Sequence, residues 1–274
     1  MTLLFLSAVL LAAGVPQRAA RPYVNPDSAQ CAPSERQMDV MSVLEGQSVH
    51  PTFAAGEELH YSASFQKLHI SVHVGGAEMR FFGRDTVRGR MAWKASFTVG
   101  GGLPGLSVHD TTTSWFDSLS FDSYRFVQNV HDPHYHANRD TQIFPDERTY
   151  RTKDGKVGPS VADPLDDVSL VYLVRTLPLA PGQCYVFRRY FKPDGNPVVV
   201  HVVRRDTLDV PAGRFVALLL RPQITTSRMF SKSGNARLWL SDDSARTLVQ
   251  LETNMSFGSI NLYLRHIGPE ADRR

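Results

Sequence analysis

Alternating apolar and polar residues run through most of this chain and constrain its fold more than any other feature. In the stretch EELHYSASF, Leu59, Tyr61 and Phe65 fall on one face, while charged and hydroxyl side chains fall on the other. A repeat of two residues is typical of a β-strand with one buried face. Similar stretches recur as far as SINLYLRHI, separated by turn sequences such as KPDGNP and VPAG. Many short strands of this kind predict an antiparallel sheet.

We expect a mainly β fold over residues 53–267, either a single curved antiparallel sheet or a partly open barrel, with one packed α-helix. Hydrophobic residues make up 42% of the chain and charged residues 21%, so a packed core is expected. The strands supply large side chains that we predict to point inward: Phe65, Trp93, Trp115, Tyr190 and Trp239. They either fill the core or line a cavity for a small ligand.

The predicted helix is DPLDDVSLVYLVRTLP, residues 163–178. Asp163 is placed at the N-cap and Pro164 at the first helical position, and Asp166 and Asp167 in the first turn face the positive end of the helix dipole. Pro178 prevents the helix from continuing. Because apolar residues surround most of this segment, we expect it to be buried against the sheet.

Two glycine-rich stretches interrupt the strand pattern. Gly75–Gly76 marks a bulge or a tight turn. Gly100–Leu106 lacks the Lys and Ser/Thr of a phosphate-binding loop and is predicted to be a mobile loop with apolar residues near its tip. This loop is either a plain strand connection or an apolar finger that touches lipid or a partner.

The first residues resemble an export signal. Leu3–Ala13 is an apolar run of signal-peptide length, interrupted only by Ser7 and followed by small residues, although no Lys or Arg precedes it. The alternatives are an uncleaved apolar N-terminus or a misplaced start codon. We expect a signal peptide over 1–20, a leader over 21–52 and a C-terminal tail over 268–274, in a periplasmic or secreted protein. No other stretch reaches the ~20 apolar residues of a membrane helix, so no integral span is expected in the mature chain.

The two cysteines fit an oxidising compartment. Cys31 and Cys184 either form one disulfide that closes a long loop or remain unpaired thiols. The net charge of +3 is spread along the chain without a basic run, which argues against nucleic-acid binding. Nucleophile elbows and zinc-protease motifs are absent from the sequence. No cofactor is expected.

The stretch NVHDPHYHANRD gathers three imidazoles, His131, His134 and His136. Converging imidazoles bind zinc or copper, but the spacing matches no established metal motif. Asp132-Pro133 initiates turns, and both flanks read as strands. We therefore favour a hairpin connection with solvated histidines over a metal site.

Paired carboxylates could divide the roles of acid and base. Asp166–Asp167 is explained by the start of the helix, and Asp242–Asp243 by a turn between strands. A hydrolase-type enzyme would need several polar side chains to meet in one cleft, drawn from His109, Asp110, His131, His134, Asp242 and Asp243.

Several longer stretches resemble a bacterial domain-of-unknown-function family, DUF3108. They include AGEELHYSASF, DDVSLVYLVRTLPLAPGQCYVF, TLDVPAGRFVALLLRP, ARLWLSDDSARTLVQLE and GSINLYL, in this order between residues 53 and 267. The resemblance implies an exported β-rich envelope protein without an assigned reaction, and it supplies no catalytic residues.

The sequence therefore favours a non-enzymatic exported protein that holds a lipid, another apolar small molecule or an envelope component. One alternative is the hydrolase above. Another is a scaffold or assembly factor that engages a partner envelope protein through a sheet edge or the Gly100–Leu106 loop.

Overall fold

The computed structural model describes residues 31–38, 40, 52–67, 70–103, 106–132, 135–224, 236–255 and 258–269. The expected signal peptide and C-terminal tail lie almost wholly outside this part of the chain. Its strands form one fifteen-stranded sheet, in the order β1-β10-β11-β12-β13-β14-β15-β2-β3-β4-β5-β6-β7-β8-β9. Every neighbouring pair is antiparallel except β1 and β10. The mainly β prediction is confirmed.

The first half of the sheet is a meander of β2 (Glu57–Lys67), β3 (Ile70–Val87), β4 (Arg90–Leu103), β5 (Leu106–Phe116), β6 (Ser123–Asp132), β7 (Tyr135–Phe144), β8 (Thr149–Thr152) and β9 (Val157–Pro159). The second half contains β10 (Gln183–Phe187), β11 (Val198–Val210), β12 (Gly213–Gln223), β13 (Arg237–Ser241), β14 (Leu248–Met255) and β15 (Gly258–Ile267). A short 3-10 turn, η2 (Pro193–Gly195), lies between β10 and β11.

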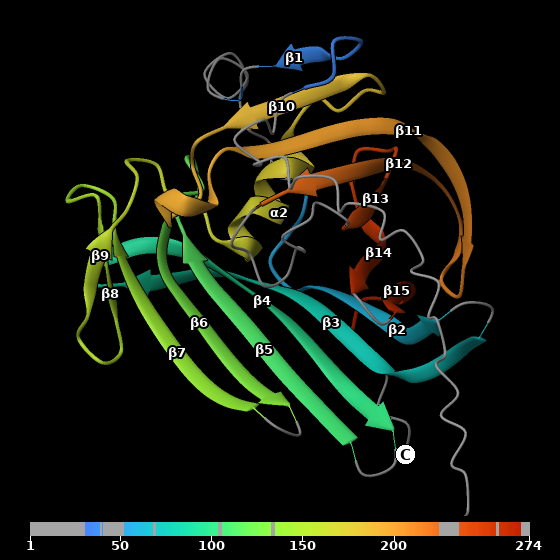
Figure 1. Cartoon of the computed structure of the whole chain (residues 1–274), viewed down its shortest axis with the longest axis horizontal. Helices are drawn as coiled ribbons and strands as arrows, with labels where there is room; N and C mark the ends of the chain where they lie inside the picture. Colours follow the sequence, from blue (N-terminus) through green and yellow to red (C-terminus); the bar gives the residue numbers. More distant parts are fainter. Residues whose placement is uncertain are drawn as a thin grey trace, which may run out of the picture.

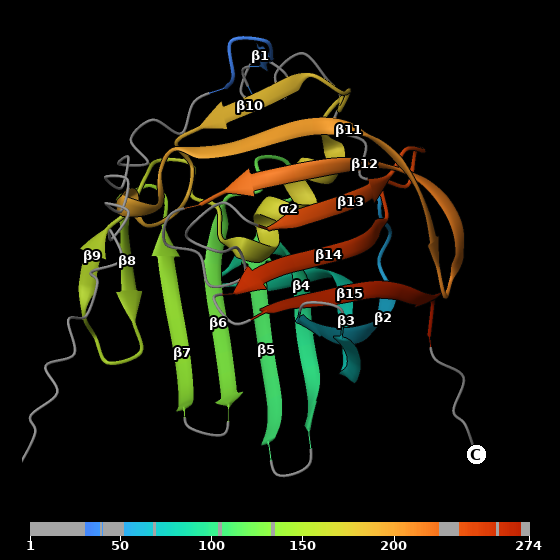
Figure 2. The ribbon, with the colours of Figure 1, turned by 45° about the vertical axis from the view of Figure 1, so that its right-hand side comes forward.

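The sheet curls around the helix without closing. β15 pairs with β2 and joins the two halves, so the strands wrap in a continuous curve (Figure 1). The ends of the sheet, β9 and β1, do not pair with each other. Figure 2 shows β4 to β7 extending well beyond the helix, which leaves their inner faces uncovered by it. The sheet is therefore a curved, open wall rather than a barrel without edges.

Helix α2 (Asp167–Thr176) packs on the concave side of the sheet, as expected. It begins later than predicted: Asp166, not Asp163, is the N-cap, and its carboxylate accepts from the backbone N–H groups of Val168 and Ser169. Pro164 lies outside the helix because Leu165 bridges to Tyr190 in an extended conformation. Nine of its ten residues are buried, as expected for a helix with apolar residues around most of its circumference.

The inner face of the sheet and the helix share one apolar core. Of the five side chains predicted to point inward, Tyr190 and Trp93 contact this core, Phe65 is half-buried on β2, and the other two pack elsewhere. Trp115 packs with Val87, Ala92 and Tyr124, and Trp239 with Ala217 and Leu219, in two smaller separate clusters. Each indole N–H donates to an aspartate, Trp115 to Asp85 and Trp239 to Asp206, at 2.8 Å. Indoles can pack on the outer face because a carboxylate satisfies their one polar group.

The glycine stretches belong to long strands. β3 runs through Gly75–Gly76 with a register shift at Ala63/Ser64 of β2, which is the predicted bulge. The predicted loop Gly100–Leu106 is wrong: its first four residues end β4, Leu106 begins β5, and Leu103 pairs with Leu106. Residues 104–105 at the tip lie outside the described part.

Part of the expected leader belongs to the sheet. β1 (Arg36–Met38) pairs in parallel with β10, and Cys31 is joined to Cys184 of β10 in a disulfide with Cα atoms 5.6 Å apart. Within the described residues, no helix combines the length and the apolar character needed to cross a bilayer.

Candidate ligand-binding cavity

A buried polar network fixes the N-terminus of α2. Asp166 is fully buried, and its second carboxylate oxygen accepts from the Ser114 hydroxyl of β5 at 2.5 Å. Its backbone N–H donates to the hydroxyls of Ser123 and Ser169, at 2.9 Å each. Burial raises the pKa of Asp166 to about 6. These contacts tie the helix start to β5 and β6 and so place Asp167, the next residue.

β9 forms one end of the sheet, and it lies next to the segment 189–196 without pairing to it. We call this place the seam; it is beside the start of α2. Here the chain after β9 meets the segment 189–196, and the Ser160 hydroxyl donates to the Phe191 carbonyl at 2.8 Å in place of a strand ladder. Asn196 holds the segment through bonds to the backbone N–H and carbonyl of Tyr190, both 2.8 Å. The Tyr190 hydroxyl donates to Asp167 at 3.1 Å. The Tyr190 ring and the Asp167 carboxylate are thus held together beside the seam.

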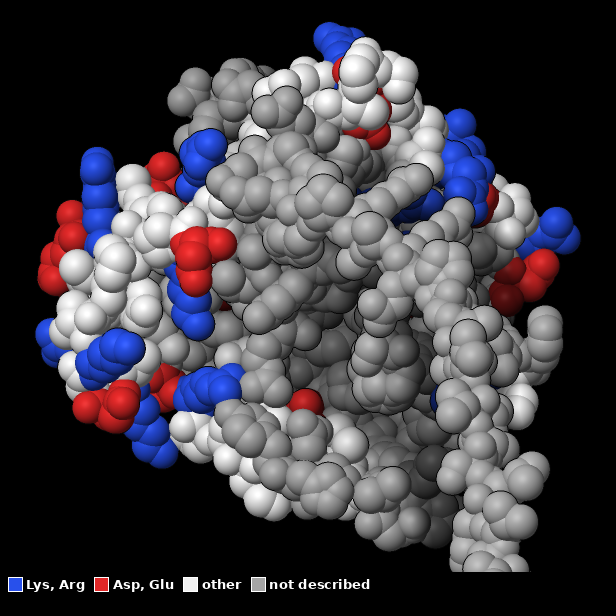
Figure 3. All heavy atoms as spheres, viewed as in Figure 1, with Lys and Arg blue, Asp and Glu red and all other residues white. Residues whose placement is uncertain are grey.

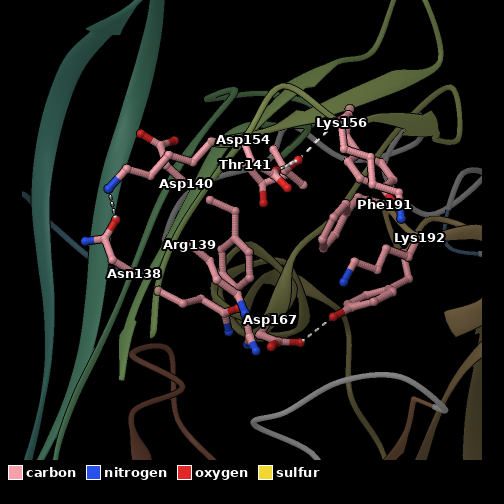
Figure 4. A pocket seen from close by; sticks show the side chains of 15 residues that line it. Asn138, Arg139, Asp140, Thr141, Asp154, Lys156, Asp167, Phe191 and Lys192 are labelled. Atoms are coloured by element: carbon pink, nitrogen blue, oxygen red, sulfur yellow. Dashed lines mark hydrogen bonds between the residues drawn. The ribbon is translucent and has the colours of Figure 1, made fainter. Parts of the chain in front are cut away.

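A cavity of about 690 Å³ occupies this seam. We call it the seam cavity; it lies between the inner faces of β6 to β8, the start of α2 and the segment 189–196. Figure 4 shows Arg139 and Lys192 on opposite sides of it, with Asp167 between them in this view. The volume falls within the roughly 300–1,000 Å³ of small-molecule sites.

A second, smaller cavity of about 260 Å³ lies deeper on the concave face. Six apolar side chains dominate the lining of this inner cavity: Phe97, Val99, Val130, Leu251, Ile260 and Leu262. Gln128 and Asp167 line both cavities, so the two spaces are neighbours at these residues. The concave face therefore places a polar cavity next to an apolar one.

Other spaces border the helix. Two voids between α2 and the sheet have volumes of only about 10 Å³ each, and Val171 and Leu238 line both. Such voids hold about one water molecule at most. A wide hollow of about 770 Å³ lies at the other end of α2, and its lining includes Phe53, Arg175 and Arg246. Beside the start of α2, space for a ligand lies in the seam and inner cavities.

Cations outnumber carboxylates around the seam cavity. Arg139, Lys153, Lys156 and Lys192 line it, together with Asp140, Asp154 and Asp167. Elsewhere on this face, both signs of charge are intermixed over β7 to β9 (Figure 3). The local excess of positive charge therefore belongs to the cavity and is not part of a broad basic surface.

The comparison with known families is decisive for identity. The sequence matches the model of DUF3108, proteins of unknown function, over residues 59–265. The chain belongs to the DUF3108 family. No curated protein matches the sequence of this DUF3108 member.

Solved structures of similar architecture share little sequence with this DUF3108 protein. A β-barrel-like protein of the domain of unknown function DUF1849 from Brucella abortus aligns with a TM-score of 0.47 and 10% identity, over 77% of this chain and 96% of its own. A DUF1089 family protein from Pseudomonas aeruginosa aligns with a TM-score of 0.36 and 12% identity, over 67% and 92% respectively.

The histidine stretch forms the end of the β6–β7 hairpin in this DUF3108 protein. His131 and His136 are exposed cross-strand partners with ring centroids 5.3 Å apart. His134 lies outside the described residues. Two exposed imidazoles at the end of a hairpin fit the hairpin prediction. The described residues alone supply fewer ligands here than the three or four of a zinc site.

The residues required for a hydrolase lie in separate places. His109 and Asp110 are adjacent on β5 and so face opposite sides of the sheet. Asp110 lines the inner cavity and accepts from the His131 backbone N–H at 3.0 Å. Asp242 is ion-paired with Arg205 and Arg246 at the β13–β14 turn, and the Asp243 carboxylate accepts from the Ser241 hydroxyl in the same turn. Among the described members of this set, no imidazole nitrogen is hydrogen-bonded to a carboxylate.

The sequence analysis did not single out Gln128 or Arg139. The alternation of β7 could have revealed Arg139, because Arg139, Thr141 and Ile143 share a face and Ile143 is fully buried. Gln128 follows from its pairing with Arg139. Arg139 pairs with Gln128 across the strands, so both side chains point to the concave side. Polar residues on an otherwise apolar face were the available signal.

Proposed function

We propose that this DUF3108 protein binds an amphiphilic small molecule in its open interior, outside the cytoplasm. The observation that carries the proposal is that the polar seam cavity and the apolar inner cavity are neighbours, with Gln128 and Asp167 lining both. A polar cavity next to an apolar one matches a molecule with one polar and one apolar end. Binding sites are typically apolar cavities with a few fixed polar groups.

The inner cavity favours the apolar end of such a ligand. Val130 and Leu262 are nearly fully buried, and they also line this cavity. Placing hydrocarbon there removes apolar surface from water, which is favourable by roughly 25 cal/mol per Å². Gln128, Thr112 and Thr253 could hydrogen-bond a polar group near the chain.

An extracytoplasmic location is supported by two features. Leu3–Ala13 has the composition of a signal peptide. Cys31 and Cys184 are joined in a disulfide, and such bonds persist in oxidising compartments.

Native mass spectrometry of the protein purified from its own cells tests the proposal. We expect the mature chain to carry additional mass that organic extraction removes and that lipid analysis identifies as a single-chain or double-chain amphiphile. Recovery of ligand-free protein, together with no saturable binding of any amphiphile in vitro, would overturn the proposal.

A further inference from the structure

We infer that the seam cavity is a subsite for an anionic headgroup, a carboxylate or a phosphate, at the end of an apolar chain that lies in the inner cavity. This inference rests on the proposed function and names the chemical class of its ligand. Arg139 on the inner wall and Lys192 on the opposite side would hold the headgroup between them.

Arg139 occupies an unusual position for a cation. Its cross-strand partner is Gln128, and the next inward residues on β7, Thr141 and Ile143, lead into the buried core. The guanidinium is half-buried on the concave wall. A planar guanidinium can donate two parallel hydrogen bonds to a carboxylate or phosphate, which makes Arg the preferred partner for both groups.

Lys192 approaches from the other side of the opening. It precedes the η2 turn, is half-buried, and its ammonium lies 5.4 Å from the centroid of the Phe191 ring. Figure 4 shows its side chain extending toward the middle of the cavity. Lys153 and Lys156 lie further out in the β8–β9 turn and add positive charge at the mouth.

The carboxylates around the cavity do not cancel this charge. Asp140 receives two bonds from Arg125, at 3.1 and 2.6 Å, and Arg125 is not part of the lining. Asp154 accepts from the Thr152 hydroxyl at the exposed turn. Asp167 is only 1% exposed and accepts from Tyr190. With Asp140 bonded to Arg125, four cations in the lining outnumber the two remaining carboxylates, Asp154 and Asp167.

The chain would enter the inner cavity past Gln128 and Asp167, which line both spaces. A headgroup at Arg139 thus lies at the polar end of a path whose far end is lined by Leu251, Ile260 and Leu262. A cationic amphiphile would meet Arg139 and Lys192 at the same point, where like charges repel.

Binding of four probes with the same alkyl chain tests the inference. They are dodecanoate, dodecyl phosphate, the neutral monododecanoylglycerol and dodecyltrimethylammonium, each titrated below its micellar concentration by calorimetry. We expect one or both anions to bind at least about tenfold more tightly than the neutral probe, since a hydrogen bond to a charged group contributes roughly 1.5–3 kcal/mol. The two anionic probes distinguish a fatty acid from a phosphorylated lipid.

Variants assign the preference to residues. Arg139→Gln and Lys192→Gln should each reduce the preference for the anion without weakening the neutral probe. Arg151→Gln is the matched control, because Arg151 is an exposed β8 residue outside the lining. Equal affinity for anionic and neutral probes, or a preference unchanged in both variants, would overturn the inference while leaving the proposed function intact. Failure of all four probes would count against both.

Discussion

Arg175, in the last turn of α2, donates to both carboxylate oxygens of Glu57 at the start of β2, at 2.6 and 2.8 Å. The Arg175 side chain is fully buried, and the Glu57 side chain is 14% exposed. A third bond, at 3.2 Å, reaches the Ala245 carbonyl in the β13–β14 turn. One buried guanidinium thus fastens the end of the helix to both halves of the sheet.

Loss of the Glu57 charge should destabilise the protein strongly. In Glu57→Gln the guanidinium stays buried without its counter-ion, and breaking a buried pair costs on the order of 3–5 kcal/mol. Because Glu57 is partly exposed, we expect about 3 kcal/mol of lost unfolding free energy, measured by urea denaturation.

The matched control is Arg90→Gln, which breaks the exposed pair with Asp146. Water already screens that pair, so its removal should leave the urea midpoint almost unchanged. Equal shifts in the two variants would show that the Arg175 pair has no special role.

The pKa of Asp166 predicts a pH dependence of folding. Its folded pKa of about 6 lies above the ordinary value of 3.8 because the carboxyl is buried. The folded state therefore holds this proton more tightly than the unfolded chain, and this group lowers the unfolding free energy as pH rises from about 4 to about 6. A rise of this size corresponds to about 3 kcal/mol.

Asp166→Asn should remove that component, because an amide does not ionise and can still cap the helix. The difference in unfolding free energy between variant and wild type should grow in favour of the variant across this pH window. Asp209→Asn, at an exposed hairpin position, controls for the loss of one charge. Parallel pH profiles for Asp166→Asn and wild type would contradict the account.

A close backbone approach between β3 and β4, where Gly75 pairs with Gly101, requires glycine. Gly101 has φ +147°, and a Cβ there would lie 2.0 Å from the Val74 carbonyl oxygen. Gly101→Ala should therefore cost about 3 kcal/mol through overpacking and backbone strain. Gly89→Ala, at φ +77° with open space around it, should cost only about 1 kcal/mol in the same urea assay. Equal costs would argue against the close approach.

The disulfide should protect one edge of the sheet. β1 has only three residues and pairs with β10 alone, so Cys31→Ser removes its covalent tether. We expect faster amide hydrogen exchange over residues 31–38 and 182–187, with unchanged protection in β4, because weakly anchored edges open locally. Unchanged exchange in β1 and β10 would show that strand pairing alone holds this edge.

The sequence identified the strands well because alternation depends only on which face is buried. It misplaced the helix start because Asp163-Pro164 and Asp166-Asp167 both resemble helix starts. The choice depends on Ser114 and Ser123, which reach Asp166 from strands more than forty residues away. Trp115 and Trp239 were assigned inward because an indole is largely apolar. On the outer face, Asp85 and Asp206, which are distant in sequence, accept the hydrogen bonds of the two indole N–H groups.

The cavity was harder to predict from the sequence than the strands were. Its wall alternates as predicted, but its opening depends on β9 failing to pair with the far end of the sheet, which is a long-range property. Tyr190 was recognised only as an inward aromatic. Its role beside Asp167 needs the fold of the segment 189–196.

The most direct measurement compares neighbouring tryptophan substitutions on β5. Thr112 lines the inner cavity, whereas Thr113, the next residue, faces the opposite side of the sheet. We predict that an apolar fluorescent probe, N-phenylnaphthylamine, binds saturably to wild type and to Thr113→Trp but not to Thr112→Trp, whose indole fills the cavity, with all three folded by circular dichroism. Equal binding to a folded Thr112→Trp would contradict a ligand site in the concave interior.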